Sequence, residues 1–210
     1  MTRESMIQKV RTALRRNAGQ PPSGAPAVRL PFPGAPLEAR LLQFCNSVET
    51  LAGKIYRASS KTDACAYASS LLGSGTAVAS NAPLLRECGI TGLAGVQTGL
   101  LDAADLRKLC ATVDLGITGA DYALADTGTL VMLSSAEEAR MISLLPPVHL
   151  AVIPRDRILT GLEELFSLLP RPDQKTSSMV LITGPSRTAD IEQILIRGVH
   201  GPGEIHVVVI

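Results

Sequence analysis

The chain has 210 residues, of which 46% are hydrophobic, so it can bury the core of one large domain or two small ones. Aromatic residues make up only 3% and Trp is absent, which argues against the base-stacking surfaces of proteins that bind single-stranded nucleic acid. The net charge of +1 gives no general attraction to nucleic acid or membranes, and no run of about 18 apolar residues predicts a membrane span.

The first 40 residues differ from the rest in charge and composition. They contain seven basic and two acidic residues, which gives this head a charge of +5 against −4 for the remainder. Apolar residues recur at helical spacing near the start, namely Met6, Ile7, Val10 and Leu14. We therefore expect an amphipathic helix in residues 1–18, a proline-rich linker in 19–37 and one α/β domain in 38–210. An Arg-rich transit peptide is the alternative for the head, and Glu4 counts against it.

The third part alternates between short apolar runs and amphipathic stretches. Strands are predicted over residues 54–58, 76–80, 111–118, 129–133 and 149–153. Helices are predicted over residues 38–51, 61–72, 83–88, 103–110 and 162–169. Because strands alternate with helices, the fold class is α/β, with a mostly parallel sheet flanked by helices.

Two further segments carry helix-start signals. Residues 134–137, Ser-Ser-Ala-Glu, have the form of a capping box and predict a helix that runs to Pro146.

Near the C-terminus, residues 179–210 read as a strand, a polar turn, an amphipathic helix, a Gly/Pro turn and a second strand. Arg187 in the polar turn is expected at the helix N-terminus, where a cation opposes the helix dipole unless an anion binds beside it. This turn is therefore predicted to bind a small anion or an acidic partner group, with simple capping as the alternative.

A second candidate site lies in residues 116–130, GITGADYALADTGTL. Its two carboxylates, Asp121 and Asp126, stand among hydroxyls and glycines just beyond a predicted strand. One interpretation is a backbone-lined cup for a ligand, with two carboxylates and several hydroxyls. Ordinary turn chemistry explains the same residues, because Asp, Thr and Gly are what turns require.

Other chemical signals are few. His149 and His200 stand beside a predicted strand and a predicted turn, where each could exchange a proton near neutral pH or be structural. No nucleophile elbow, zinc motif, dinucleotide fingerprint or P-loop is present. No two of the four cysteines are closer than 20 residues, so we expect no metal site and no cofactor in this chain. Isolated cysteines without a signal peptide indicate the cytoplasm.

Three segments in order carry a family resemblance: GITGADYALADTGTLVML, RMISLLPPVHLAVIP and ITGPSRTADIEQILIRGVHGPGEIHVVVI. Over residues 50–210 the chain resembles the lactate utilization protein C family of the LUD-domain group. The resemblance implies a fold like that of NagB, RpiA and the CoA transferases. It also implies a role with two iron–sulfur partner proteins in oxidising L-lactate to pyruvate. The chain departs from the family at two positions. Asp126 stands where the family often has Glu, and Ala139 stands before Arg140 where the family often has Gly.

The resemblance and the residues together predict a cluster-free subunit that binds a carboxylate ligand or docks a partner. Asp121, Asp126 and His149 are the catalytic candidates. The ligand-binding candidates are Thr118, Gly119, Thr127, Gly128, Thr129, Gly184, Ser186, Arg187, Thr188 and His200. The expected partners are the iron–sulfur subunits and a small carboxylate or other anion, with no nucleic acid, and a homo-oligomer is left open. The alternative is an independent enzyme like a CoA transferase, isomerase or cyclo-ligase that uses Asp121 or Asp126.

Overall fold

The computed structural model of the protein describes residues 2–15, 34–99, 102–188 and 196–210. Helix α1 (Arg3–Leu14) is capped by Thr2 and belongs to a unit, Met1–Pro31, that is separate from Phe32–Ile210. The predicted N-terminal helix is therefore present, whereas most of the predicted linker lies outside the described residues. Within the described ranges, no helix is long and apolar enough to cross a membrane.

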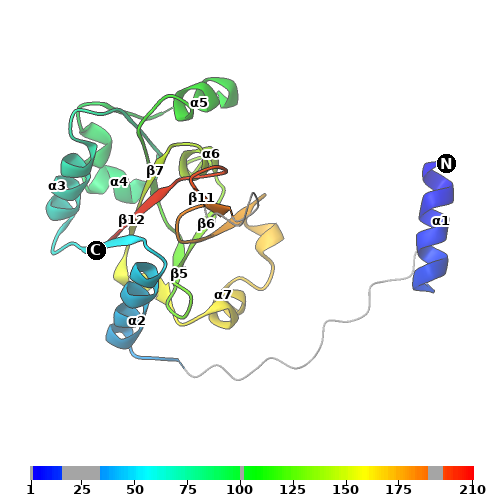
Figure 1. Cartoon of the computed structure of the whole chain (residues 1–210). Coiled ribbons are helices and arrows are strands. Elements are labelled where there is room, and N and C mark those ends of the chain that lie inside the picture. The colour runs from blue at the N-terminus through cyan, green and yellow to red at the C-terminus, as the bar shows by residue number, and fades with distance from the viewer. Residues whose placement is uncertain (1, 16–33, 100–101, 189–195) are drawn as a thin grey trace. The chain divides into compact units, whose positions relative to one another are not determined.

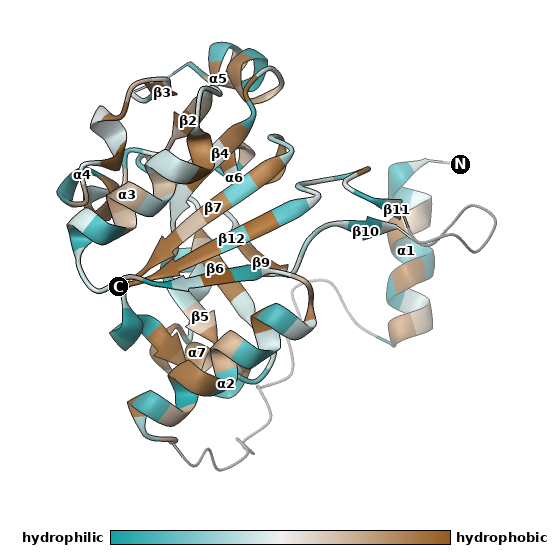
Figure 2. Ribbon diagram, turned by 60° about the vertical axis from the view of Figure 1, so that its left-hand side comes forward, coloured by the Kyte–Doolittle hydropathy of each residue, from teal (hydrophilic) through white to brown (hydrophobic). Residues whose placement is uncertain are grey.

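The unit Phe32–Ile210 is built on sheet A, in which six strands pair only in parallel. Figure 2 shows five of them side by side, from β3 through β2, β4 and β7 to β12. In spatial order the strands are β1 (Lys54–Arg57), β12 (Glu204–Val209), β7 (Val148–Ile153), β4 (Leu115–Gly119), β2 (Ala77–Ala79) and β3 (Val96–Gln97). The predicted α/β class with a mostly parallel sheet is confirmed.

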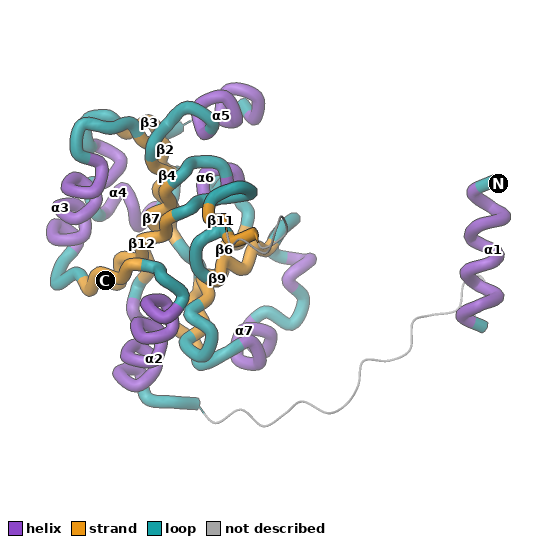
Figure 3. The backbone as a smooth tube through the Cα atoms, in the orientation of Figure 1, coloured by secondary structure: helices purple, strands orange, loops and turns teal. Residues whose placement is uncertain are grey.

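Helices cover both faces of sheet A (Figure 1, Figure 3). They are α2 (Leu37–Thr50), α3 (Lys61–Leu72), α4 (Pro83–Glu87), α5 (Ala103–Cys110) and α6 (Met141–Leu144). Alternate residues of a strand face opposite sides. Leu150 and Val208 accordingly pack in the core with α3 and α4, whereas Ala151 and Val207 pack in the core with α2. Strands buried on both faces explain why their sequences are continuous apolar runs.

A second, four-stranded sheet packs against the α2 core. Sheet B has the order β8 (Ile158–Leu159), β5 (Tyr122–Leu124), β6 (Thr129–Leu133) and β9 (Met179–Thr183), and helix α7 (Leu162–Leu168) adjoins it. Its β5–β6 and β6–β9 pairs are antiparallel, and β5–β8 is parallel. The strand β4 leads directly into β5, so the chain passes from one sheet to the other at Ala120 and Asp121.

The segment after β9 corrects one prediction. Arg187 lies in the short strand β10 (Arg187–Thr188), which pairs antiparallel with β11 (Ile196–Arg197), and not at a helix N-terminus. The predicted helix itself falls mainly on residues 189–195, which lie outside the described residues. Because strands flank that segment, the helix-dipole argument for an anion at Arg187 no longer applies.

The predicted capping box is also only partly correct. The hydroxyl oxygen that accepts the capping hydrogen bonds belongs to Ser135, which receives the N–H groups of Glu137 and Glu138. No helix follows there, because α6 begins only at Met141. Residues 134–140 instead form a loop that lies against the ends of β2 and β4, where the Asn81 N–H donates to the Glu137 carbonyl.

Gly116 gives a test of this packing. A Cβ atom at Gly116, in the middle of β4, would lie 2.0 Å from the carbonyl oxygen of Ile142 in α6. The change Gly116→Ala must therefore push α6 off the sheet, and we expect it to lower stability by about 2 kcal/mol or more. Thermal unfolding should show a drop of roughly 4–8 °C for a chain of this size. The control Gly92→Ala places its Cβ in open space, and an equal loss of stability in both variants would contradict the packing described.

Candidate functional site

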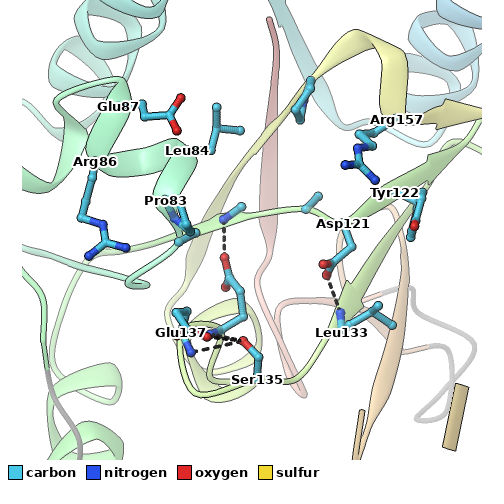
Figure 4. A pocket seen from close by; sticks show the side chains of 15 residues that line it. Pro83, Leu84, Arg86, Glu87, Asp121, Tyr122, Leu133, Ser135, Glu137 and Arg157 are labelled. Carbon is cyan, nitrogen blue, oxygen red and sulfur yellow. Dashed lines mark hydrogen bonds between the residues drawn. The ribbon is translucent and has the colours of Figure 1, made fainter. Parts of the chain in front are cut away.

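A pocket of about 600 Å³ opens at the carboxyl ends of β2, β4 and β7. Ligands of open parallel sheets bind at this edge, because the loops that follow the strands can present polar groups there. Ala82 follows β2, Gly119 ends β4 and Pro154 follows β7, and all three line the pocket. Figure 4 shows the charged side chains around it: Arg86, Glu87, Asp121, Glu137 and Arg157.

The carboxyl group of Glu138 is held at the inner wall of this pocket. Its Oε1 atom accepts hydrogen bonds from the Ser80 hydroxyl and from the Gly119 N–H, both at 2.8 Å. A side chain at position 119 would crowd this contact, because a Cβ there would lie 3.0 Å from Oε1. None of the described residues donates a hydrogen bond to the second oxygen, Oε2. That oxygen is therefore available to a ligand.

Burial sets the protonation of Glu138. The pKa of Glu138 is raised to about 7, mainly by loss of water around the carboxyl and to a smaller extent by the nearby Asp121 charge. The hydrogen bonds from Ser80 and Gly119 favour the ionised form, but they do not offset the loss of solvation. A carboxyl with a pKa near 7 can both give and accept a proton under ordinary cellular conditions.

Asp121 stands beside Glu138, where the chain leaves sheet A. Its Oδ2 accepts the Leu133 N–H at 2.7 Å, which joins it to the end of β6. Burial is the main cause that raises the pKa of Asp121, while the Leu133 hydrogen bond and the Arg157 charge act in the opposite direction. The Arg157 guanidinium lies 5.6 Å from the centre of the Tyr122 ring, a contact that favours a cation there.

The remaining charges of the pocket are partly compensated. Glu87 is paired with Lys61 at 2.6 Å, and Glu137 faces the Ser135 hydroxyl at 3.3 Å. Arg86 and Arg157 are exposed, and their guanidinium groups make no hydrogen bond or ion pair with any residue that the structure describes. Figure 4 shows them on opposite sides of the pocket. Two guanidinium groups at one pocket, neither hydrogen-bonded nor ion-paired to a described residue, favour a ligand with a carboxylate or phosphate group.

Several predicted site residues do meet here. Gly119 ends β4 and Asp121 follows it, and both line the pocket, while their roles in ligand binding and catalysis stay predictions. Thr118 and His149 do not line it: they are buried in sheet A, where the Thr118 hydroxyl and His149 Nε2 are 2.8 Å apart. Burial lowers the pKa of His149 to about 4, so the ring is neutral at physiological pH and serves packing.

The turn after β5 lies elsewhere. Asp126 and Thr127 line a separate groove of about 520 Å³ beside α2, and Thr129 is hydrogen-bonded to the Thr127 and Thr183 hydroxyls. Gly128 has φ +63°, and a Cβ there would lie 2.8 Å from the Val48 nitrogen of α2. The two predicted carboxylates, Asp121 and Asp126, are therefore not in one site, and Gly128 is required by packing.

The C-terminal candidates also lie outside the pocket. Gly184, with φ +75°, packs against Leu51, and the Arg187 guanidinium donates to the Leu51 carbonyl oxygen. The Ser186 N–H donates to the Pro202 carbonyl, while Thr188 belongs to β10 and His200 is exposed. A ligand-binding role for these residues stays a prediction, without geometry that joins them to Asp121.

The sequence did not indicate three residues that line the pocket, Arg86, Glu138 and Arg157, or Ser80, which donates a hydrogen bond to Glu138 from behind it. Ser80 and Arg157 follow the strands β2 and β7, so the rule that polar residues after parallel strands form the site would have indicated them. No sequence signal indicates Glu138, because its partners are 58 and 19 residues away in the chain. Across the described residues, no group of three or more His, Cys, Asp or Glu side chains is arranged to hold a metal ion.

The shifted pKa of Glu138 predicts a pH-dependent stability. Between about pH 4.5 and 7 the folded protein holds a proton on Glu138 that the unfolded chain releases, so stability falls as the pH rises through this window. Glu138→Gln removes this loss and keeps an acceptor for Ser80 and Gly119. We expect the variant to be more stable than the wild type by roughly 1–3 kcal/mol at pH 8, and nearly equal to it at pH 4.

Thermal unfolding at the two pH values measures this difference. Glu49→Gln, at an exposed carboxylate of α2 outside the pocket, is the matched control and should follow the wild type. A Gln variant at position 138 that is destabilised at pH 8 would contradict the assigned protonation.

Comparison with known proteins places this geometry in a family. The LUD domain model matches residues 41–210. Curated relatives named lactate utilization protein C include that of Halalkalibacterium halodurans, 42% identical over 42% of this chain and 40% of the relative. Lactate utilization protein C 1 of Bacillus mycoides is 35% identical over 50% of this chain and 46% of the relative. The matched segments thus span less than half the length of these relatives.

One solved structure is similar in fold. A DUF162 family protein from Deinococcus radiodurans superposes with a TM-score of 0.66 and 20% sequence identity, over 83% of this chain and 98% of that one. Its likeness extends over the same α/β architecture. Since the family model covers most of the chain, including both sheets and every residue of the pocket, the chain belongs to the LUD domain family.

Proposed function

We propose that this chain is a subunit of a lactate utilization system, and that it binds a small carboxylate in the pocket formed by β2, β4 and β7. The names of the curated relatives support the lactate role. The observation that supports a carboxylate ligand is the pair Arg86 and Arg157, whose guanidinium groups line one pocket and make no hydrogen bond or ion pair with any of the described residues. A carboxylate can accept two parallel hydrogen bonds from one such group.

The pocket also supplies a group that can exchange protons with a hydroxy acid. Oxidation of L-lactate to pyruvate releases two electrons and two protons, and Glu138 titrates in the range where it can take up the hydroxyl proton. Electron transfer requires a cofactor. The four cysteines are too far apart in the sequence for a cluster motif, so iron–sulfur partner proteins would accept the electrons. The volume of the pocket, about 600 Å³, is larger than that of a three-carbon acid and leaves room for a group from a partner protein.

The second candidate function is an independent enzyme, and the observation that favours it is a pair of buried carboxyl groups in the pocket. Asp121 and Glu138 share the pocket, and burial raises the pKa of each, which makes both carboxyls candidates for proton transfer. An independent transferase or isomerase would use this pair, whereas Asp126 lies in another groove. Assays of the purified chain alone for CoA transfer and for sugar-phosphate isomerisation distinguish this candidate from the lactate subunit.

The carboxylate site is tested by ligand titration. Isothermal titration of the purified chain with L-lactate and with pyruvate at pH 6.5 should give one binding site. Arg157→Ala should weaken binding about tenfold or more, because a charge-assisted hydrogen bond is lost. Arg157→Lys should recover only part of it, since an ammonium group cannot form the paired contact. Arg107→Ala, an exposed arginine of α5 outside the pocket, should bind as the wild type does.

The partner claim is tested separately in the native cell. A pull-down of the tagged chain should recover iron–sulfur proteins, while the chain purified free of them should be colourless and unable to oxidise lactate. Visible absorption from a bound flavin or cluster in the isolated chain would overturn the assignment of the electrons to partners. Failure of both carboxylates to bind would overturn the ligand claim.

A further inference from the structure

We propose that the protonation state of Glu138 selects between the two oxidation states of the ligand: the 2-oxo acid binds only the protonated carboxyl, whereas the 2-hydroxy acid binds both the protonated and the ionised form. This inference rests on the proposed function, because it takes the carboxylate pocket as the lactate and pyruvate site. It adds a specificity-determining residue that acts through the direction of one hydrogen bond.

The geometry of Glu138 fixes where its proton resides. Ser80 and Gly119 both donate to Oε1, so that oxygen is fully engaged as an acceptor. A proton taken up by the carboxyl therefore lies on Oε2, the oxygen that is hydrogen-bonded to no described residue. Protonated Glu138 thus presents an O–H donor to the pocket, and ionised Glu138 presents an acceptor at the same place.

The two ligands differ in what they can offer to Oε2. The carbonyl oxygen of a 2-oxo acid only accepts hydrogen bonds, so it needs the protonated carboxyl. The hydroxyl of a 2-hydroxy acid can donate as well as accept, so it can bind either form. When Glu138 is ionised, the 2-oxo acid places acceptor against acceptor, and a polar group left unpaired in this way is strongly disfavoured.

The surrounding charges affect both ligands alike. The charged groups around the pocket are Asp121 from the β4–β5 connection, Glu137 from the same loop as Glu138, Arg157 beyond β7, and Arg86 and Glu87 from α4, the latter paired with Lys61 of α3. Each ligand carries one carboxylate, so repulsion or attraction by these groups changes both affinities by the same factor. The ratio of the two affinities therefore reports the hydrogen bond to Glu138 and cancels the general electrostatics of the pocket.

Glutamine at position 138 imitates the protonated state. Its Oε1 can accept from Ser80 and Gly119, and its amide NH₂ then lies where Oε2 does, as a permanent donor. Ser80→Ala provides a second, independent variant. The Ser80 hydrogen bond lowers the pKa of Glu138, so its removal should move the titration to higher pH without changing the carboxyl itself.

The experiment measures Kd for pyruvate and for L-lactate by isothermal titration at pH 6.0, 7.0, 8.0 and 9.0. In the wild type, the ratio of the pyruvate Kd to the lactate Kd should rise about tenfold or more over this range. In Glu138→Gln the ratio should be constant, and in Ser80→Ala its rise should shift to higher pH. Glu49→Gln, the matched carboxylate control outside the pocket, should behave as the wild type does.

Three results overturn parts of the account. A wild-type ratio that is constant with pH, while both ligands bind, contradicts the selection by Glu138 and leaves the carboxylate site intact. A ratio in Glu138→Gln that still changes as in the wild type assigns the effect to another group and also contradicts the selection. If neither ligand binds the wild type at any of the four pH values, the proposed function itself fails.

Discussion

The hydrogen bonds that Glu138 Oε1 accepts from Ser80 and Gly119 join three parts of the fold. Ser80 follows β2, Gly119 ends β4, and Glu138 lies in the loop that follows β6 of the second sheet. The contact therefore fixes the loop of sheet B against the carboxyl edge of sheet A. It also defines the inner wall of the pocket, because Gly119 and Glu138 both line it.

The burial of Glu138 lowers the stability of the fold above neutral pH and gives the carboxyl a pKa that suits proton exchange. Burial disfavours the charge on Glu138 more than its two hydrogen bonds favour it, so the pKa of Glu138 is raised to about 7. Above neutral pH, a fully solvated carboxylate at this position would lower the free energy of unfolding less than the buried Glu138 does. Groups that are held at such a disadvantage cluster at functional sites, since their protonation can then respond to a ligand.

The sequence predicted the order of strands and helices well, but it predicted few of the residues that line the pocket. The alternation of strands and helices, and the helix predicted over residues 61–72, depend on neighbouring residues, and both predictions are correct. The helix start at Arg187 is wrong because β10 pairs with β11, a contact that lies beyond the range of a local pattern. Asp121 and Gly119 were found because they follow a strand, whereas Glu138 reaches its place only through residues that are distant in the chain.

The titration of Glu138 tests the central claim most directly. Carbon-13 NMR of the chain labelled at the glutamate carboxyls, with Glu138 assigned by comparison with the Glu138→Gln variant, follows this group as the pH changes. The account predicts a midpoint near pH 7, well above the usual value of 4.5 for a glutamate. A midpoint near 4.5 would show that the carboxyl is solvated and ionised, and the pocket described here would then have no proton-exchanging group at neutral pH.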